Sequence, residues 1–202
     1  MTIVQSESVA TGITRIAINR PEKRNAVSPE VRDALIDTFS NALNDEDVQA
    51  IVLGSTDGHF CAGGDIDTMV EMDVSSGRTR MKENHRMVRL LAEAEKPIVA
   101  AVEGYAVGAG AGIALLCDSI VITKGGTLGF PFFRIGLTPD YGILFTLAYL
   151  IASILPSVPL LPNPPGIRTP DTFFNNGFTI SGFTLSESIL FKLTFTLFDM
   201  PP

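Results

Sequence analysis

The residues best suited to chemistry in this chain form two glycine-rich turns, each placed where a helix is expected to begin. The first is Ala62-Gly63-Gly64-Asp65, and the second is Gly108-Ala109-Gly110-Ala111-Gly112. Backbone without large side chains at a helix start leaves N–H groups pointing outward, with the positive end of the helix dipole behind them. If the two turns converge, their amides form an oxyanion hole for a thioester or another carbonyl. The alternative is that small residues only let a helix pack closely against a strand.

The second turn can also be compared with a dinucleotide-binding loop. That loop requires the pattern G-x-G-x-x-G near the first strand of a domain, with an acidic residue about 20 positions later. Here Gly112 comes one residue too early, Asp118 follows Gly108 by only ten positions, and the segment lies in the middle of the chain. We therefore favour the anion site over a dinucleotide site.

The elements that must position these turns alternate between strands and helices. Ser28-Pro29-Glu30 is typical of a helix start, with serine as the N-cap and proline in the first turn, and apolar residues follow it at helical spacing. Alternating or short apolar runs predict the strands. The expected strands are 12–19, 50–54, 98–102, 119–123 and 127–130, and the expected helices are 29–43, 65–70, 78–95 and 113–117. Strands that alternate with helices predict an α/β fold.

Composition excludes several classes of partner. The formal net charge of −7 over 202 residues argues against nucleic acid. No uncharged apolar run reaches the ~20 residues needed to span a bilayer, except in the tail, where prolines interrupt it, so we expect no membrane partner. Two cysteines, Cys61 and Cys117, form neither a disulfide framework nor a metal site, and we interpret Cys61 as a packing residue. The start of the chain lacks a signal peptide, so we expect a cytoplasmic protein.

The last part of the chain differs from the rest. Residues 153–202 contain eight prolines and seven phenylalanines but only five charged residues, and they show no sustained helix or strand period. We therefore predict one folded domain, 1–152, followed by an atypical Pro/Phe-rich tail, 153–202. A shifted reading frame or another aberrant end would explain such a tail.

Four segments together resemble the enoyl-CoA hydratase/isomerase (crotonase) superfamily, in order along the chain from about residue 12 to 150. They are NRPEKRNA (19–26), FCAGGDI (60–66), the stretch 96–118 and IGLTPD (135–140). The resemblance implies a ββα spiral core whose C-terminal helical part is truncated or atypical. It also implies an acyl-CoA thioester as substrate, with no separate cofactor and no metal, and a homotrimer or hexamer if the C-terminal part permits.

The same resemblance implies roles for individual residues. The two amides that hold the thioester oxygen fall on Gly64 and Ala109. Three phenylalanines, Phe130, Phe132 and Phe133, would line a dry pocket around the reaction. The residues expected to contact the substrate or its CoA part are Arg24, Ala26, Ala62, Gly63, Asp65, Ile66, Gly108 and Phe132.

Departures from the family pattern indicate the subclass. Hydratases of this family carry two catalytic glutamates, where this chain has Gly112 and Phe132. Adding water requires a base and an acid, so hydratase activity is not expected. Asp140 falls where isomerase-type members carry an acid, which predicts a base that takes a proton from C2 of a 3-enoyl-CoA and returns it at C4. By itself, Pro139-Asp140 is also a common turn pair.

Two other interpretations remain open. The chain can be a catalytically inactive CoA-binding or scaffold protein, as the two missing glutamates and the unusual tail would allow. It can also use its lone aspartate for another reaction of the superfamily, such as epoxide isomerisation, thioester hydrolysis or dehalogenation.

Overall fold

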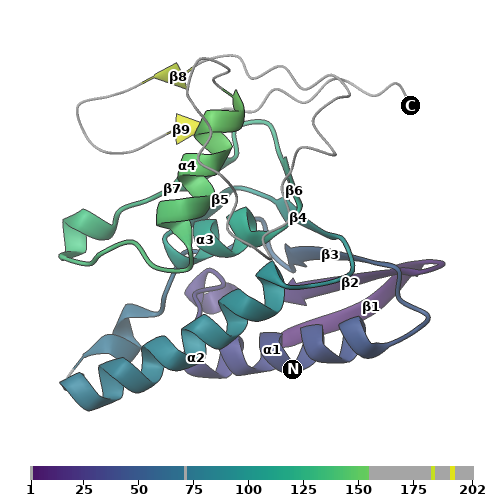
Figure 1. Ribbon diagram of the computed structural model, residues 1–202, viewed down its shortest axis with the longest axis horizontal. Coiled ribbons are helices and arrows are strands. Elements are labelled where there is room, and N and C mark those ends of the chain that lie inside the picture. The colour runs from purple at the N-terminus through teal and green to yellow at the C-terminus, as the bar shows by residue number, and fades with distance from the viewer. Residues whose placement is uncertain (1, 71, 155–182, 185–191, 194–202) are drawn as a thin grey trace.

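The protein is built on a five-stranded sheet beside a small two-stranded one (Figure 1). The computed structural model describes residues 2–70, 72–154, 183–184 and 192–193. The main sheet has the order β1-β2-β3-β4-β6, with β1 and β2 antiparallel and the remaining pairs parallel. Its strands are β1 (Val4–Ala10), β2 (Ile13–Ile18), β3 (Ala50–Ser55), β4 (Ile98–Val102) and β6 (Ser119–Ile122). The second sheet pairs β5 (Tyr105–Val107) with β7 (Thr127–Gly129) in parallel.

The helices lie in two groups. Helices α1 and α2 pack against one another beside the main sheet, and α3 packs against β5 and α4 (Figure 1). Short 3-10 helices occupy three of the connections. The helices are α1 (Pro29–Asn44), α2 (Val74–Ala92), α3 (Ala109–Leu116) and α4 (Ile143–Ile154), with η1 (Pro21–Lys23), η2 (Ile66–Met69) and η3 (Phe132–Ile135).

The core lies between the parallel strands and the helices that cover them. The side chains of Ile16, Ile51 and Leu53 on β2 and β3 are fully buried, and α1 contributes Leu35 and Phe39 to the same cluster. Each such side chain contributes about 1.5–3 kcal/mol when it leaves water. This core fixes the ends of β3 and β4, after which the two glycine turns follow.

The predicted α/β class is confirmed, as is the start of α1. The Ser28 hydroxyl accepts the Val31 N–H at 3.4 Å, and Pro29 is the first helical residue. Two helices begin earlier than predicted. Helix α2 starts at Val74 because Asp73 caps it, accepting the Ser76 N–H at 2.7 Å.

The second early start is that of α3, which begins at Ala109, directly after Gly108. Two strands and one α-helix before residue 155 were not predicted, namely β1, β5 and α4. Strand β1 is exposed along most of its length, so its sequence shows no apolar period, and β5 is only three residues long. Both strands depend on pairing with a neighbour rather than on local sequence.

The predicted tail, 153–202, lies outside the described residues apart from 153–154 and two short strands. These strands, β8 (Phe183–Thr184) and β9 (Lys192–Leu193), pair in antiparallel fashion. Within the described parts of the chain, none of the helices combines the length and the apolar character that crossing a membrane requires.

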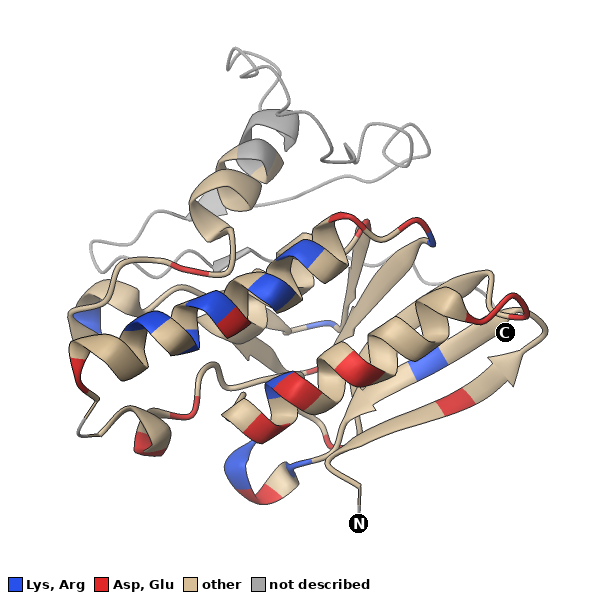
Figure 2. Cartoon of the chain, turned by 60° about the horizontal axis from the view of Figure 1, so that its bottom comes forward, with Lys and Arg blue, Asp and Glu red and all other residues tan. Residues whose placement is uncertain are grey.

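Charged side chains are distributed unevenly over the two neighbouring helices. Figure 2 shows acidic residues along α1 and mainly basic residues along α2. The acidic residues of α1 are Glu30, Asp33 and Asp37, and the basic residues of α2 are Arg78, Arg80, Lys82, Arg86 and Arg89. The basic helix α2 comes shortly after the first glycine turn, with η2 between them.

Candidate active site

Backbone hydrogen bonds hold the first glycine turn against the loop that precedes α1. The Ala62 N–H donates to the Arg24 carbonyl at 3.0 Å, and the Val27 N–H donates to the Gly63 carbonyl at 2.7 Å. The Asp65 N–H completes the ladder, donating to the Val27 carbonyl at 3.0 Å. Two segments predicted to bind CoA, at 24–26 and 62–66, are thus brought together.

The first turn is also tied to β5, the strand that leads into the second turn. The Cys61 N–H donates to the Tyr105 carbonyl at 3.1 Å, and the Val107 N–H donates to the Cys61 carbonyl at 2.9 Å. Burial raises the pKa of the Cys61 thiol to about 12, which fits a packing residue rather than a nucleophile. Cys61 therefore joins the two turns through its backbone.

Direct contact between the two turns requires glycine at two positions. A Cβ atom added at Gly63, whose φ is +106°, would lie 2.9 Å from the Val107 carbonyl oxygen and 3.8 Å from the Ala109 nitrogen. A Cβ atom added at Gly110 would lie 2.6 Å from Cβ and 2.7 Å from the carbonyl oxygen of Cys61. Any side chain at either position would push the turns apart.

Among the described residues, the backbone amides of Gly64 and Ala109 have no acceptor, and neither do those of Gly110 and Ala111, the next two residues of α3. Ala109 is the first residue of α3, so its N–H has no partner within the helix. The neighbouring Gly108, at φ +53°, instead donates its N–H to the Gly129 carbonyl at 2.8 Å. Unpaired amides at adjoining turns, one of them at a helix N-terminus, favour an anion or a carbonyl oxygen that gains negative charge.

Asp140 lies in a tight turn just before α4. The Ile143 N–H donates to the Asp140 carbonyl at 3.1 Å, and the two central residues, Tyr141 and Gly142, have φ values of +50° and +74°. Positive φ at both central positions is typical of a type I′ turn, and it is unfavourable for tyrosine. The turn is therefore held in this conformation by its surroundings.

The Asp140 carboxyl combines an unpaired oxygen with a raised pKa. Its Oδ1 atom is buried and has no hydrogen-bond partner within the described part of the chain. Burial raises the pKa of this carboxyl, while the backbone and the positive charges of Arg80 and His85 act in the opposite direction. A carboxylate with a raised pKa and a free oxygen is a stronger base than one in water.

Tyr141 fills the space at the position where hydratases carry a glutamate. A Cβ atom added at Gly112 would lie 2.5 Å from the Tyr141 Cβ and 3.2 Å from the Ile143 Cδ1. Tyr141 is only 4% exposed, and its burial raises the pKa of its hydroxyl well above the usual value. Helix α3 therefore has no room for a longer side chain at this point.

Two of the three phenylalanines predicted to line a dry pocket are buried, and their role around a substrate stays a prediction. Phe130 and Phe132 are buried, and the Phe132 ring lies 3.9 Å from the Cβ position of Gly108. Phe133 is 66% exposed, so the prediction that it lines a dry pocket is wrong. In the single turn of η3 adjacent side chains point in different directions, which separates Phe133 from Phe132.

The other residues predicted to contact CoA differ in their exposure and in their contacts. Arg24 is exposed, with φ at +51°, and Ala26 is nearly buried, with its carbonyl accepting from Arg20 at 3.2 Å. Ile66 is exposed. The Asp65 side chain is 4% exposed and forms an ion pair with Arg20 at 2.6 Å, so it maintains the turn.

The electrostatic setting of Asp65 agrees with this structural role. Burial acts to raise the pKa of its carboxyl, but hydrogen bonds from Arg20 and from the Asp67 N–H, with the nearby positive charges of Arg20 and Lys23, bring the pKa below its usual value. Asp65 also caps η2 by accepting the Asp67 N–H. Arg20 itself was not among the predicted site residues, although it lies in the NRPEKRNA segment.

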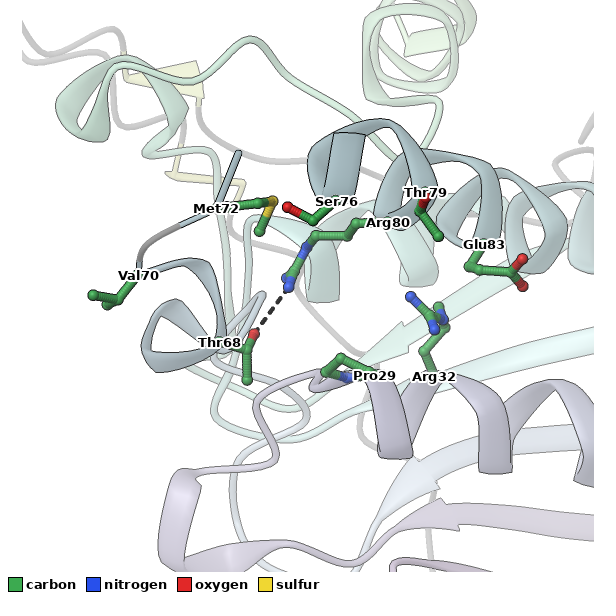
Figure 3. Close-up of a pocket in the computed structure, with 9 residues that line it drawn as sticks. All are labelled: Pro29, Arg32, Thr68, Val70, Met72, Ser76, Thr79, Arg80 and Glu83. Atoms are coloured by element: carbon green, nitrogen blue, oxygen red, sulfur yellow. Dashed lines mark hydrogen bonds between the residues drawn. The ribbon is translucent and has the colours of Figure 1, made fainter. Parts of the chain in front are cut away.

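A cavity of about 370 Å³ lies between the start of α1, η2 and α2 (Figure 3). One of the residues around it, Arg80, reaches Gly64, because the Arg80 Nη2 atom lies 3.6 Å from the Gly64 Cβ position. The cavity was not predicted from the sequence, since it joins the start of α1 to η2 and α2, which follow much later in the chain. It is lined by Pro29, Arg32, Thr68, Val70, Met72, Ser76, Thr79, Arg80 and Glu83.

Fold and candidate site together describe an α/β protein with two adjoining glycine turns and, before α4, an aspartate whose Oδ1 atom is buried. A family model described as enoyl-CoA hydratase/isomerase matches residues 8–154. The chain belongs to this enoyl-CoA hydratase/isomerase family. The crotonase-like fold predicted from the sequence is thereby confirmed.

Characterised relatives and solved structures point to the same family. The chain is 34% identical over 128 residues to the short-chain-enoyl-CoA hydratase of Clostridium acetobutylicum, and 32% identical over 127 residues to the 2,3-dehydroadipyl-CoA hydratase of Escherichia coli. Each match covers 63% of this chain and 49% of the relative. A solved enoyl-CoA hydratase from Thermoplasma volcanium has a TM-score of 0.70 at 28% identity, over 74% of this chain and 59% of that one. The chain thus spans about half the length of the curated relatives it matches.

Proposed function

We propose that this chain is an enoyl-CoA isomerase that shifts a double bond through a thioester enolate. The amides of Gly64 and Ala109 hold the thioester oxygen, and Asp140 moves the proton. The observation that carries the proposal is the buried Asp140 Oδ1, which has no hydrogen-bond partner in the described part of the chain. Asp140 is followed by Tyr141, which packs on the first turn of α3, so the carboxylate is anchored to the helix that begins with Ala109.

One carboxylate is sufficient for this reaction. Asp140 takes a proton from C2 of a 3-enoyl-CoA, and the electron pair of that C–H bond moves into the thioester, whose oxygen becomes negative. The two amides donate hydrogen bonds to this oxygen, an interaction that strengthens as the charge develops. The protonated Asp140 then returns its proton at C4, which leaves the double bond conjugated with the thioester. A raised pKa assists the first step because it increases the basicity of the carboxylate.

The hydratase alternative is less well supported by the residues, although several relatives carry that name. Water addition needs one group to activate water and another to protonate the α-carbon. This chain has Gly112 and Phe132 at the two positions where the family's hydratases carry glutamate, and Tyr141 occupies the space beside Gly112. Asp140 would have to perform both tasks alone.

The CoA part would bind to the two backbone segments that the first turn brings together, 24–26 and 62–66. Arg24 is exposed at this edge and is positioned by its left-handed backbone, which suits a phosphate contact. Gly108 and the Phe132 ring would border the thioester end of the bound acyl-CoA. The acyl-CoA thioester is the only organic group this mechanism requires, and assembly into a homotrimer or hexamer stays a prediction.

A second candidate is a protein that binds acyl-CoA without turning it over. It is favoured by one observation, namely that Gly112 and Phe132 stand where the family's hydratases carry glutamate. The described turns can bind a thioester without those two carboxylates.

The test is to incubate the full chain with a 3-enoyl-CoA and follow the absorbance of the conjugated thioester. Turnover is expected, and Asp140→Asn is expected to lower it by about 10²–10⁴, the usual effect of losing a general base. Asp37→Asn, an equal change at an exposed position of α1, serves as the matched control and keeps full activity. Faster hydration of a 2-enoyl-CoA, or full activity in Asp140→Asn, would overturn the proposal. Binding of the CoA ester without turnover would favour the second candidate.

A further inference from the structure

Arg80 is a cation inside the cavity that lacks a carboxylate partner among the described residues. Its Nη1 atom donates to the Thr68 hydroxyl at 2.9 Å, and no acidic side chain of the described chain lies within ion-pair distance of it. Its side chain is only partly exposed, because it extends from α2 across the cavity toward η2 (Figure 3). A guanidinium held by one neutral hydroxyl retains free donors for an anion.

The other charged residues around the cavity already have partners. Arg32, which is 7% exposed, forms an ion pair with Asp33 at 2.8 Å. Glu83 lies at 3.3 Å from Arg86, one turn further along α2. Asp140 does not form an ion pair with Arg80. The charge of Arg80 acts on the pKa of Asp140 only through space. The cavity therefore presents net positive character at Arg80.

The position of this cation relative to the amide site determines what it can bind. Its second terminal nitrogen, Nη2, lies 3.6 Å from the Cβ position of Gly64, the residue whose amide is unpaired. The Met69 Cε atom lies nearer to that position, at 2.9 Å, so Met69 and Arg80 both border Gly64. An acyl chain whose carbonyl oxygen binds at Gly64 would thus reach Arg80. The remaining wall offers apolar surface for methylene groups from Pro29, Val70 and Met72.

We propose that the cavity selects acyl-CoA substrates whose acyl chain ends in a carboxylate, and that Arg80 binds that carboxylate. The inference rests on the proposed function only in that the thioester lies at Gly64. A neutral acyl chain would leave the guanidinium without an anion next to apolar groups, whereas a carboxylate can form two parallel hydrogen bonds with it. The hydrogen bond to Thr68 already holds one side of the Arg80 guanidinium, so the Arg80 side chain loses little conformational freedom when the carboxylate binds.

The test compares two unreactive ligands of equal length, adipyl-CoA and hexanoyl-CoA, which differ in a terminal carboxylate. Isothermal titration of the full chain is expected to show adipyl-CoA binding about 10-fold to 100-fold more tightly, the range for hydrogen bonds to a charged group. Arg80→Met should abolish this preference, and Arg80→Lys should keep part of it. Arg89→Met removes the same charge from the opposite face of α2 and should leave the preference intact.

Each outcome decides a specific point. Equal affinities in the unchanged protein, or a preference that survives Arg80→Met, would overturn the inference, and the first of these needs no variant that must fold. A preference for adipyl-CoA without turnover of 3-hexenoyl-CoA or 3-hexenedioyl-CoA would overturn the isomerase and keep the carboxylate site. Turnover of both substrates, together with equal affinities for adipyl-CoA and hexanoyl-CoA, would support the isomerase and overturn the carboxylate site. Failure to bind either ligand would overturn both.

Discussion

The two parts of the candidate site are built in different ways. The amide pair at Gly64 and Ala109 consists of backbone alone, in turns held by a network of main-chain hydrogen bonds and by contact between the turns. Asp140, in contrast, is a single side chain on a tight turn that contains a tyrosine in a left-handed conformation. The first part depends on glycine spacing, and the second depends on one residue.

This difference separates the step the family shares from the step that distinguishes its members. A pair of backbone amides can stabilise negative charge on any thioester oxygen, whatever side chains surround it. The fate of the enolate depends on which acid or base stands next to it. In this chain Tyr141 packs against Gly112, which stands at the position of a hydratase glutamate, and the proposed function assigns the proton transfer to Asp140.

The largest effect on activity is expected when the Asp140 carboxylate is removed. Asp140→Asn should lower isomerase activity by about 10²–10⁴ while the protein stays folded. Since the pKa of Asp140 is raised in the folded state, its ionised form costs stability, and this cost grows as pH rises from the unfolded value to the folded one. Asp140→Asn should therefore raise the Tm at neutral pH, which differential scanning calorimetry measures; a clear fall would show that the carboxylate supports the fold.

The raised pKa of Asp140 also predicts how the activity of the unchanged protein depends on pH. The base must be ionised, so kcat/KM should fall as the pH drops through the folded-state pKa of Asp140. Because that pKa is raised, the fall should begin at a higher pH than for an ordinary aspartate, which has a pKa of about 3.9. A profile that stays flat down to the ordinary range would contradict the assigned base.

The backbone part can be disrupted by removing a single N–H. Proline is well tolerated at the first position of a helix, which Ala109 occupies, so Ala109→Pro should remove the donor and leave α3 intact. Activity should fall by about 10²–10³ or more, because the ring also occupies the space of the bound oxygen. Ala109→Ser keeps the N–H and should retain most activity. Equal rates for the two variants would remove this amide from the mechanism.

Contact between the turns can be tested through Gly110. A methyl group there would meet the Cβ and carbonyl oxygen of Cys61 at 2.6 and 2.7 Å, and the backbone oxygen cannot move aside as a side chain would. Gly110→Ala should cost about 1–3 kcal/mol of unfolding free energy, or roughly 2–12 °C in Tm, and should lower activity by separating the amides. Gly58→Ala, where the added methyl group meets no neighbour and φ is not in the positive range, measures the effect of a glycine-to-alanine change without a clash.

A smaller effect should couple Gly112 and Tyr141. Gly112→Ala introduces a methyl group 2.5 Å from the Tyr141 Cβ, and Tyr141→Gly removes that atom together with an unfavourable backbone conformation. The double variant should be more stable than the sum of the two single changes predicts, by about 0.5–3 kcal/mol in a denaturant titration. Strict additivity would mean that Tyr141 does not close this position.

Local patterns predicted much of what this site contains. The glycine turns were recognisable because a required close approach leaves a mark on the residue itself, as at Gly63 and Gly110. The start of α1 was recognisable from Ser28 and Pro29 for a similar reason. Asp140 was identified only through its register with a known family, since a Pro-Asp pair is otherwise an ordinary turn.

The features that sequence reasoning missed are those created by long-range contact. Arg80 looks like a solvated residue of a basic helix until the fold places it beside Gly64. Tyr141 matters because it packs on a helix formed earlier in the chain. Strand β5 is too short to show a period, and it exists because it pairs with β7.

The most direct measurement is a crystal structure of the full chain with hexanoyl-CoA, which cannot react by this route. The thioester oxygen should lie about 2.7–3.1 Å from both the Gly64 and the Ala109 nitrogens, with C2 facing the Asp140 carboxylate. An oxygen bound to only one of these amides, or a thioester located elsewhere, would contradict the account.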